Sequence, residues 1–128
     1  MSSEHRLVDY LDDMVDAARQ ACAYVDGLGK TGFIADRRTQ QAVILNLVIL
    51  GEAATRVLAR HADFVALHPQ VPWHNMRGMR NRVAHGYFDL DIDVVWDTVQ
   101  SSLPALLAQL PAVRNAAALL DESDEPGA

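Results

Sequence analysis

The chain has 128 residues, half of them apolar, with a net charge of −6 and a single cysteine, Cys22. This length suits one domain, and a single cysteine excludes an internal disulfide. An acidic chain is not expected to coat a nucleic acid, because phosphate neutralisation supplies most non-specific affinity. The longest apolar run, residues 42–50, is too short to span a bilayer, and no signal-peptide pattern is present. We therefore expect a cytoplasmic protein that makes no use of a membrane.

A first amphipathic helix is predicted over residues 5–25, where apolar residues recur every three or four positions. Ser2 or Ser3 is expected to cap its start, and the glycine-containing segment 26–32 is expected to end it.

A second helix is predicted over residues 36–61. Its middle, "AVILNLVILGEAA", is apolar on nearly all sides, so this helix is expected at the centre of the fold. Glu52 interrupts the apolar stripe, and a carboxylate placed there needs a cationic partner.

The second half of the chain predicts two more long helices. After a connector, residues 61–71, with room for one helical turn, Pro72 suits the first turn of a helix that runs to His85, with Gly86 just past its end. The acids Asp89, Asp91 and Asp93 favour the start of a fourth helix.

This fourth helix is expected to kink at Pro104. A fifth segment, residues 112–120, is expected to extend it after Pro111. No strand pattern occurs, so we predict a single all-α domain over residues 1–120, an up-down bundle of four to five helices. The acidic residues 121–128 are expected to form a flexible tail.

The most reactive side chains gather in "MRGMRNRVAHGYFDLD", residues 76–91. Arg80 falls on a mostly apolar helix face, which predicts a nearby acid such as Glu52. Arg80 and His85 are five residues apart, about 140° around a regular helix, so they do not point the same way. Either the helix loosens at His85 and Gly86, or two copies of the helix assemble one site in a homodimer.

Arginine and histidine together suit cleavage of an RNA phosphodiester without a metal. The 2′-hydroxyl is the internal nucleophile, His85 moves a proton, and Arg80 stabilises the charge that builds on phosphorus. Asn81 could orient the imidazole, and Arg77 and Arg82 could dock RNA phosphates. The remaining histidines lack the spacing of zinc ligands, so neither a metal nor another cofactor is expected.

The motif "RNRVAHGYF" resembles the Arg-x4-His-x-Tyr motif of the HEPN superfamily. The wider pattern "PWHNMRGMRNRVAHGYFDLD", the following "VVW" and the earlier "ILGEAA" are similar to its HepT-like (DUF86) branch. The likeness covers about residues 5–110. It implies an all-α, homodimeric ribonuclease toxin of a type VII toxin–antitoxin pair, whose composite site is lined by both chains.

The resemblance carries the catalytic arginine to Arg80, the polar residue after it to Asn81, the histidine to His85 and the tyrosine to Tyr87. It also implies a minimal nucleotidyltransferase as the antitoxin, which silences the toxin by attaching AMP groups to Tyr87. An added AMP would place negative charge and bulk beside a phosphate site, and so repel and block RNA.

Two other interpretations stay open. The chain could be a non-catalytic HEPN module that binds a nucleotidyltransferase or presents a substrate or nucleotide to it, which suits the acidic net charge. It could also be a structural helical dimer in which Arg80 and Glu52 serve packing and His85 caps a helix end. Glu52→Ala is expected to lower stability more than His85→Ala does.

Overall fold

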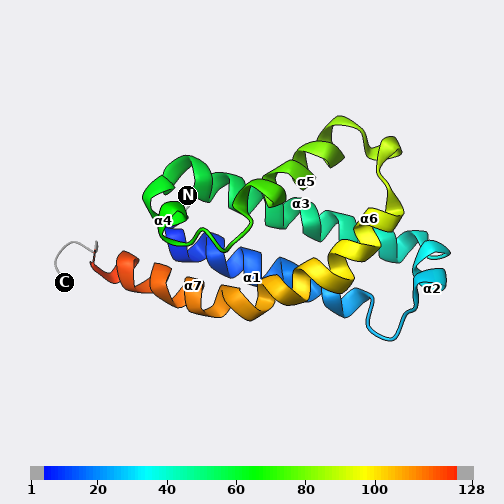
Figure 1. The fold of residues 1–128 in the computed structure, drawn as a ribbon, viewed down its shortest axis with the longest axis horizontal. Coiled ribbons are helices and arrows are strands. Elements are labelled where there is room, and N and C mark those ends of the chain that lie inside the picture. Colours follow the sequence, from blue (N-terminus) through cyan, green and yellow to red (C-terminus); the bar gives the residue numbers. More distant parts are fainter. Residues whose placement is uncertain (1–4, 124–128) are drawn as a thin grey trace.

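The computed structural model describes residues 5–123, and this part of the chain is helical without any strand. The all-α prediction is therefore confirmed (Figure 1). The helices are α1 (Leu7–Tyr24), α2 (Lys30–Ile34), α3 (Arg37–Arg60), α4 (Ala62–Leu67), α5 (Trp73–His85), α6 (Ile92–Asp97) and α7 (Leu103–Ser123), with a 3-10 turn η1 (Tyr87–Asp89).

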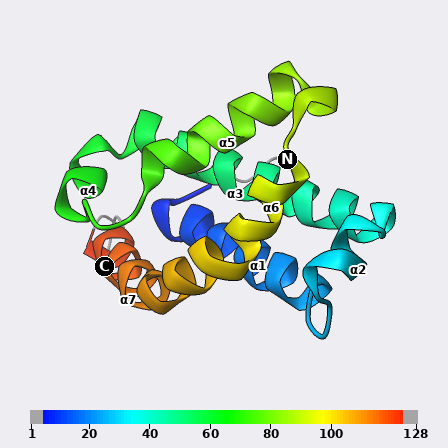
Figure 2. The same cartoon turned by 45° about the vertical axis from the view of Figure 1, so that its right-hand side comes forward.

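The long helices pack side by side in a row. Helix α1 lies between α3 and α7, and α5 packs on the other side of α3 (Figures 1 and 2). Apolar side chains from α1, α2, α3 and α7 fill the core; the largest fully buried ones include Phe33, Leu11, Met14 and Leu110. Helix α5 therefore depends chiefly on α3 for its position.

The start of α1 differs from the prediction. Ser2 and Ser3 lie outside the described residues, and the helix begins at Leu7. The Asp9 carboxylate accepts a hydrogen bond of 2.8 Å from the backbone N–H of Arg6. The predicted end is confirmed by Gly27, which has a φ of 80°, a backbone conformation that side chains disfavour.

The start of α3 is capped by Asp36, as its side-chain chemistry favours. Its carboxylate accepts from the Thr39 backbone N–H at 3.1 Å and from the Thr39 hydroxyl at 2.6 Å. These bonds stabilise the charged form, so they lower the pKa of Asp36 below its usual range.

Helix α3 was predicted to lie at the centre of the fold, but only two of its sides are covered by other long helices. The helix packs on α1 and on α5. A third side stays open, where Leu45 is 59 % exposed and Ile49 is 41 % exposed. The apolar character of this helix on all sides is therefore not explained by burial within one copy of the chain.

The last helix is longer and less regular than expected. A π-helical turn, Thr98–Ser102, joins α6 to α7 just before Pro104, where the kink was predicted. Pro111 lies inside α7 without ending it, and the helix continues to Ser123. Residues 121–123 are therefore helical, which corrects the predicted tail boundary; residues 124–128 lie outside the described part.

The end of α7 is tied to the start of α1. The Asp121 carboxylate accepts a hydrogen bond of 2.8 Å from the backbone N–H of Val8. The same carboxylate lies 3.9 Å from Nε of Arg6. These contacts join the start of α1 to the end of α7 at one end of the bundle.

Two segments are long and apolar enough to cross a bilayer by composition, α3 and residues 92–123. In the folded chain both serve as bundle helices, with buried faces against α1. Helix α3 also carries charged side chains, Glu52 and Arg56, on its open side.

Candidate active site

The contact between α3 and α5 depends on Gly51. A Cβ atom at this position would lie 2.6 Å from the Arg80 Cβ and 2.6 Å from the Met76 carbonyl oxygen. Real Cβ atoms do not approach a backbone so closely, so only glycine lets the two helices come this near. Gly51 thereby sets the position of Arg80.

Arg80 is fastened to α3 by two further contacts. Its Nε lies 3.3 Å from Oε1 of Glu52, an ion pair without a well-aligned hydrogen bond. Its Nη2 donates a hydrogen bond of 3.2 Å to the hydroxyl of Thr55. The guanidinium is therefore held in place, while its remaining N–H groups can serve a ligand.

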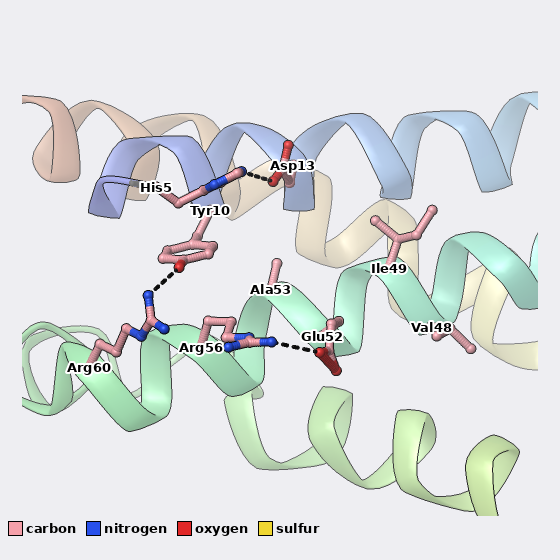
Figure 3. A pocket seen from close by; sticks show the side chains of 9 residues that line it. All are labelled: His5, Tyr10, Asp13, Val48, Ile49, Glu52, Ala53, Arg56 and Arg60. Atoms are coloured by element: carbon pink, nitrogen blue, oxygen red, sulfur yellow. Dashed lines mark hydrogen bonds and ion pairs between the residues drawn. The ribbon is translucent and has the colours of Figure 1, made fainter. Parts of the chain in front are cut away.

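The predicted partnership of Glu52 and Arg80 is confirmed, but Glu52 is not buried. Its side chain is 46 % exposed, against 27 % for Arg80. Glu52 also pairs with Arg56 at 3.5 Å (Figure 3). Because water screens such a pair, its contribution to stability is modest, at most about 1 kcal/mol.

A hollow of about 480 Å³ lies beside this pair, between α1 and α3 (Figure 3). Arg60, at its wall, donates a hydrogen bond of 2.9 Å to the Tyr10 hydroxyl. His5 lies 3.6 Å from Asp13. The cations of this hollow thus already have partners within the chain, and we assign it no ligand.

His85 lies apart from Arg80, at the exposed C-terminal end of α5. The Gly86 backbone N–H bonds to the Arg82 carbonyl at 3.0 Å, so the helix stays regular through His85. Gly86 has an extended backbone, with a φ of −164°, rather than a left-handed one. Of the two alternatives left open, loosening at His85 and Gly86 is not observed, because the last turn of α5 is closed.

The His85 side chain lines a second hollow, of about 400 Å³, between the end of α5 and the start of α6. Arg82 lines it too, together with the carboxyl-bearing Asp89 and Asp91. Arg80 faces α3 instead. One chain therefore presents the two motif residues on different sides of α5, as their spacing predicted.

The remaining predicted residues are spread along α5. Arg77 contacts His74, with 3.1 Å between Nη2 and the ring Nδ1. Asn81 is half-buried and makes no side-chain hydrogen bond to His85 within the part of the chain that the structure describes. Its supporting role stays a prediction.

Tyr87 begins the η1 turn just after α5, and its side chain is 42 % exposed. The next residue, Phe88, is 99 % exposed. The two rings stand nearly perpendicular, with centroids 6.0 Å apart. A second protein could therefore reach the phenol of Tyr87 from solvent.

Among residues 5–123, no three His, Cys, Asp or Glu side chains gather as a metal site would require. Metal independence stays a prediction.

The sequence interpretation missed three residues that the structure brings to notice. Gly51 and Thr55 position Arg80, and Phe88 stands exposed beside Tyr87. The "ILGEAA" segment contains Gly51, and a glycine inside an apolar helix is a known signal of close helix approach. No sequence pattern indicated that the Phe88 side chain is fully exposed.

Residues 14–113 match the family described as "Ribonuclease HepT-like". The chain belongs to this HepT-like family. It is 35 % identical to "Probable ribonuclease HepT" of Thermococcus cleftensis over 114 residues, which cover 89 % of this chain and 99 % of that protein.

Other HepT-like relatives are more distant. A protein of Methanocaldococcus jannaschii that bears a provisional RNase name is 30 % identical over 74 % of this chain and 76 % of its own length. Another with such a name, from Caldanaerobacter subterraneus, is 27 % identical over 81 % of this chain and 90 % of its own length. No solved structure matches the chain.

Proposed function

We propose that this HepT-like chain is a metal-independent endoribonuclease, the toxin of a type VII toxin–antitoxin pair, acting as a homodimer in the cytoplasm. The observation that carries the proposal is the divergence of Arg80 and His85 on a helix that stays regular to its last residue. Both residues serve one phosphate only if a second copy supplies the missing partner. The RNase names of the relatives support RNA as the substrate.

The open side of α3 supports a second copy of the chain as the partner. Leu45 and Ile49 are exposed there, on the same helix that holds Arg80 in place. Contiguous exposed apolar side chains on a folded protein mark interaction surfaces. In a two-fold dimer each surface meets its equivalent, so the two copies of α5 are brought to one place.

The proposed chemistry uses the ribose itself as nucleophile. The 2′-hydroxyl loses its proton to one His85, and the bond from O2′ to phosphorus forms. The bond from phosphorus to O5′ breaks, and O5′ takes up the proton that the same His85 accepted from the 2′-hydroxyl. Arg80 stabilises the extra negative charge on the phosphate oxygens, and the products are a 2′,3′-cyclic phosphate and a 5′-hydroxyl.

Three further residues support catalysis in this proposal: Asn81, Arg77 and Arg82. Arg82 lines the His85 hollow and Arg77 lies on the exposed surface of α5, so both can contact phosphates that flank the cleaved bond. Asn81 orients the substrate or the imidazole in the assembled dimer.

The proposed control acts through Tyr87. A minimal nucleotidyltransferase attaches AMP to its phenol oxygen, and the added phosphate repels RNA. The exposure of Tyr87, two residues after His85, supports this role.

A second candidate function is a non-catalytic module that binds the nucleotidyltransferase. The observation in its favour is charge: Asp89, Asp91 and Asp93 are all exposed just after Tyr87, in a chain of net charge −6. Carboxylates there suit a basic protein surface better than RNA.

The deciding experiment is cleavage of total cellular RNA by the purified, unmodified chain in excess EDTA. Wild type is compared with Arg80→Ala and His85→Ala, each checked for helical content and oligomeric state. Cleavage that persists in EDTA and is lost in both variants supports the nuclease. A folded, unmodified dimer that cleaves nothing favours the non-catalytic module.

A mixing experiment tests the shared site. Arg80→Ala and His85→Ala chains are unfolded together and refolded as a mixture, then assayed. If Arg80 of one copy works with His85 of the other, half of the dimers are mixed and each keeps one of its two sites, so about a quarter of wild-type activity returns. A mixture as inactive as its two components would contradict a site shared in this way.

A further inference from the structure

The exposed pair Tyr87 and Phe88 forms one wall of a third hollow, of about 340 Å³. The opposite wall comes from the first two turns of α3, through Arg37, Gln40 and Gln41, with Ile44 at its base. This volume falls in the range of small-molecule sites. The hollow therefore joins two segments that are some fifty residues apart in the sequence.

Its lining contains no carboxylate, unlike that of the hollow beside Glu52 and that of the hollow beside His85. Arg37 is exposed and takes part in no ion pair within residues 5–123. The neighbouring Arg38, by contrast, lies in the electrostatic field of Asp36 and does not line the hollow. Arg37 is thus an uncompensated cation at a concave surface.

The amides of the hollow are partly fixed. Nε2 of Gln40 donates hydrogen bonds of 2.9 Å and 2.8 Å to the carbonyls of Phe33 and Ile34. This leaves the Gln40 amide oxygen as an acceptor, while Gln41 is exposed with both donors and acceptor available. The aromatic rings can stack on the face of a base, the two amides can hydrogen-bond to its edge, and the arginine can pair with a phosphate. This set of groups suits a nucleotide.

The hollow also adjoins the His85 hollow, because Leu90 lines both. A nucleotide that occupies one is next to the other. The Phe88 surface therefore lies near the residues proposed for chemistry.

We propose that the hollow between Tyr87–Phe88 and the start of α3 binds one nucleotide unit, with its base stacked on Phe88 and its phosphate paired with Arg37. The unit has two possible sources, a nucleotide of the RNA beside the cleaved phosphate or the adenylyl group attached to Tyr87. The choice between these sources rests on the proposed function, whereas the binding of a nucleotide does not.

The first test is a titration of the purified, unmodified full chain with AMP, followed by backbone amide NMR. The expected result is saturable shifts at residues 37–41 and 87–90. Arg37→Gln is expected to weaken binding by about tenfold, whereas the matched control Arg38→Gln leaves it unchanged. Phe88→Leu, which keeps an apolar side chain but no aromatic face, is expected to weaken binding about five- to tenfold, and Phe88→Trp to preserve it.

A second set of measurements distinguishes the sources. A short RNA with 2′-O-methyl riboses, which cannot be cleaved, is titrated into the same variants. Weaker binding in Arg37→Gln but not in Arg38→Gln assigns the hollow to substrate RNA. If instead the chain with AMP on Tyr87 shows the shifts of the AMP-saturated protein and no longer binds free AMP, the adenylyl group is the occupant.

The proposal is overturned if neither AMP nor the RNA shifts residues 37–41, or if Arg37→Gln and Arg38→Gln weaken binding equally. Its failure is distinct from failure of the proposed function. Wild type that cleaves RNA while neither AMP nor the uncleavable RNA shifts residues 37–41 removes only this site. Wild type that binds AMP here but cleaves nothing removes only the nuclease.

Discussion

The two halves of α5 are held in very different ways. The first half buries Trp73, Met76 and Met79, and Arg80 rests directly over Gly51. The second half ends in the exposed His85 and continues into the exposed Tyr87 and Phe88. Packing thus fixes Arg80, whose proposed role requires only a charge at a fixed position. The side chains of His85, Tyr87 and Phe88 stay exposed, so they are accessible to a substrate, a second copy of the chain or a modifying enzyme.

The largest effect of a substitution is expected at the exposed C-terminal end of α5. His85→Ala is expected to lower RNA cleavage by about 10²–10⁴-fold, because it removes proton transfer. Its free energy of unfolding should stay within about 0.5 kcal/mol of wild type, since the side chain is exposed. Cleavage rates and urea denaturation measure the two quantities. A large loss of stability would show that His85 belongs to the packed half after all.

The next effect is expected at the packed half. Gly51→Ala should lower the free energy of unfolding by about 1–3 kcal/mol, because the new methyl group meets the Met76 backbone and cannot be avoided by a side-chain rotation. Activity should also fall, because Arg80 moves with α5.

Gly78 is the matched control, since it is also a glycine inside a helix, α5, but a Cβ there would meet nothing within 4 Å. Gly78→Ala should stabilise the chain by about 0.5–1 kcal/mol through its higher helix propensity. Equal effects of the two substitutions on urea denaturation would remove the argument that Gly51 permits close helix packing.

A smaller effect is expected at the salt bridge that spans the two helices. Glu52→Ala should lower stability by about 0.2–1 kcal/mol, because the pair with Arg80 is partly exposed and screened by water. Thermal melts of Glu52→Ala and His85→Ala side by side check the order of the two. A lower melting temperature for His85→Ala would exclude Glu52 as a structural support of Arg80.

The smallest effect concerns pH and the start of α3, the helix on which the packed half rests. The pKa of Asp36 is lower in the folded chain, so its stabilisation is present above the unfolded pKa and is lost as pH falls through the folded value. The melting temperature of wild type should therefore drop more steeply below about pH 4 than that of Asp36→Ala. Parallel curves for the two proteins would show that the cap contributes nothing in this range.

Sequence patterns predicted the part of the fold that depends on local rules. The stripe of apolar residues located α1, the apolar middle of residues 36–61 located α3, and Pro72 located the start of α5. The angle between Arg80 and His85 was also predictable, because a regular helix fixes it.

Local sequence rules did not predict the features that depend on contacts between distant segments. The exposure of Leu45 and Ile49 follows from the number of helices available to cover α3, which no local pattern encodes. The hollow at Arg37 exists because the η1 turn folds back over the start of α3. The helical state of residues 121–123 depends on the bond from Asp121 to the start of α1, and composition alone indicated a tail instead.

The bond between Asp121 and Val8 has a practical consequence for handling this molecule. Because α7 ends where α1 begins, both lie at the end of the bundle away from α6 and from the end of α5, which is His85 (Figure 1). An affinity tag, a fluorescent protein or a second domain can thus be fused at either terminus with the region around His85 left uncovered. A peptide linker between residues 123 and 5 would likewise permit a circularly permuted chain with new ends in the loop before α2.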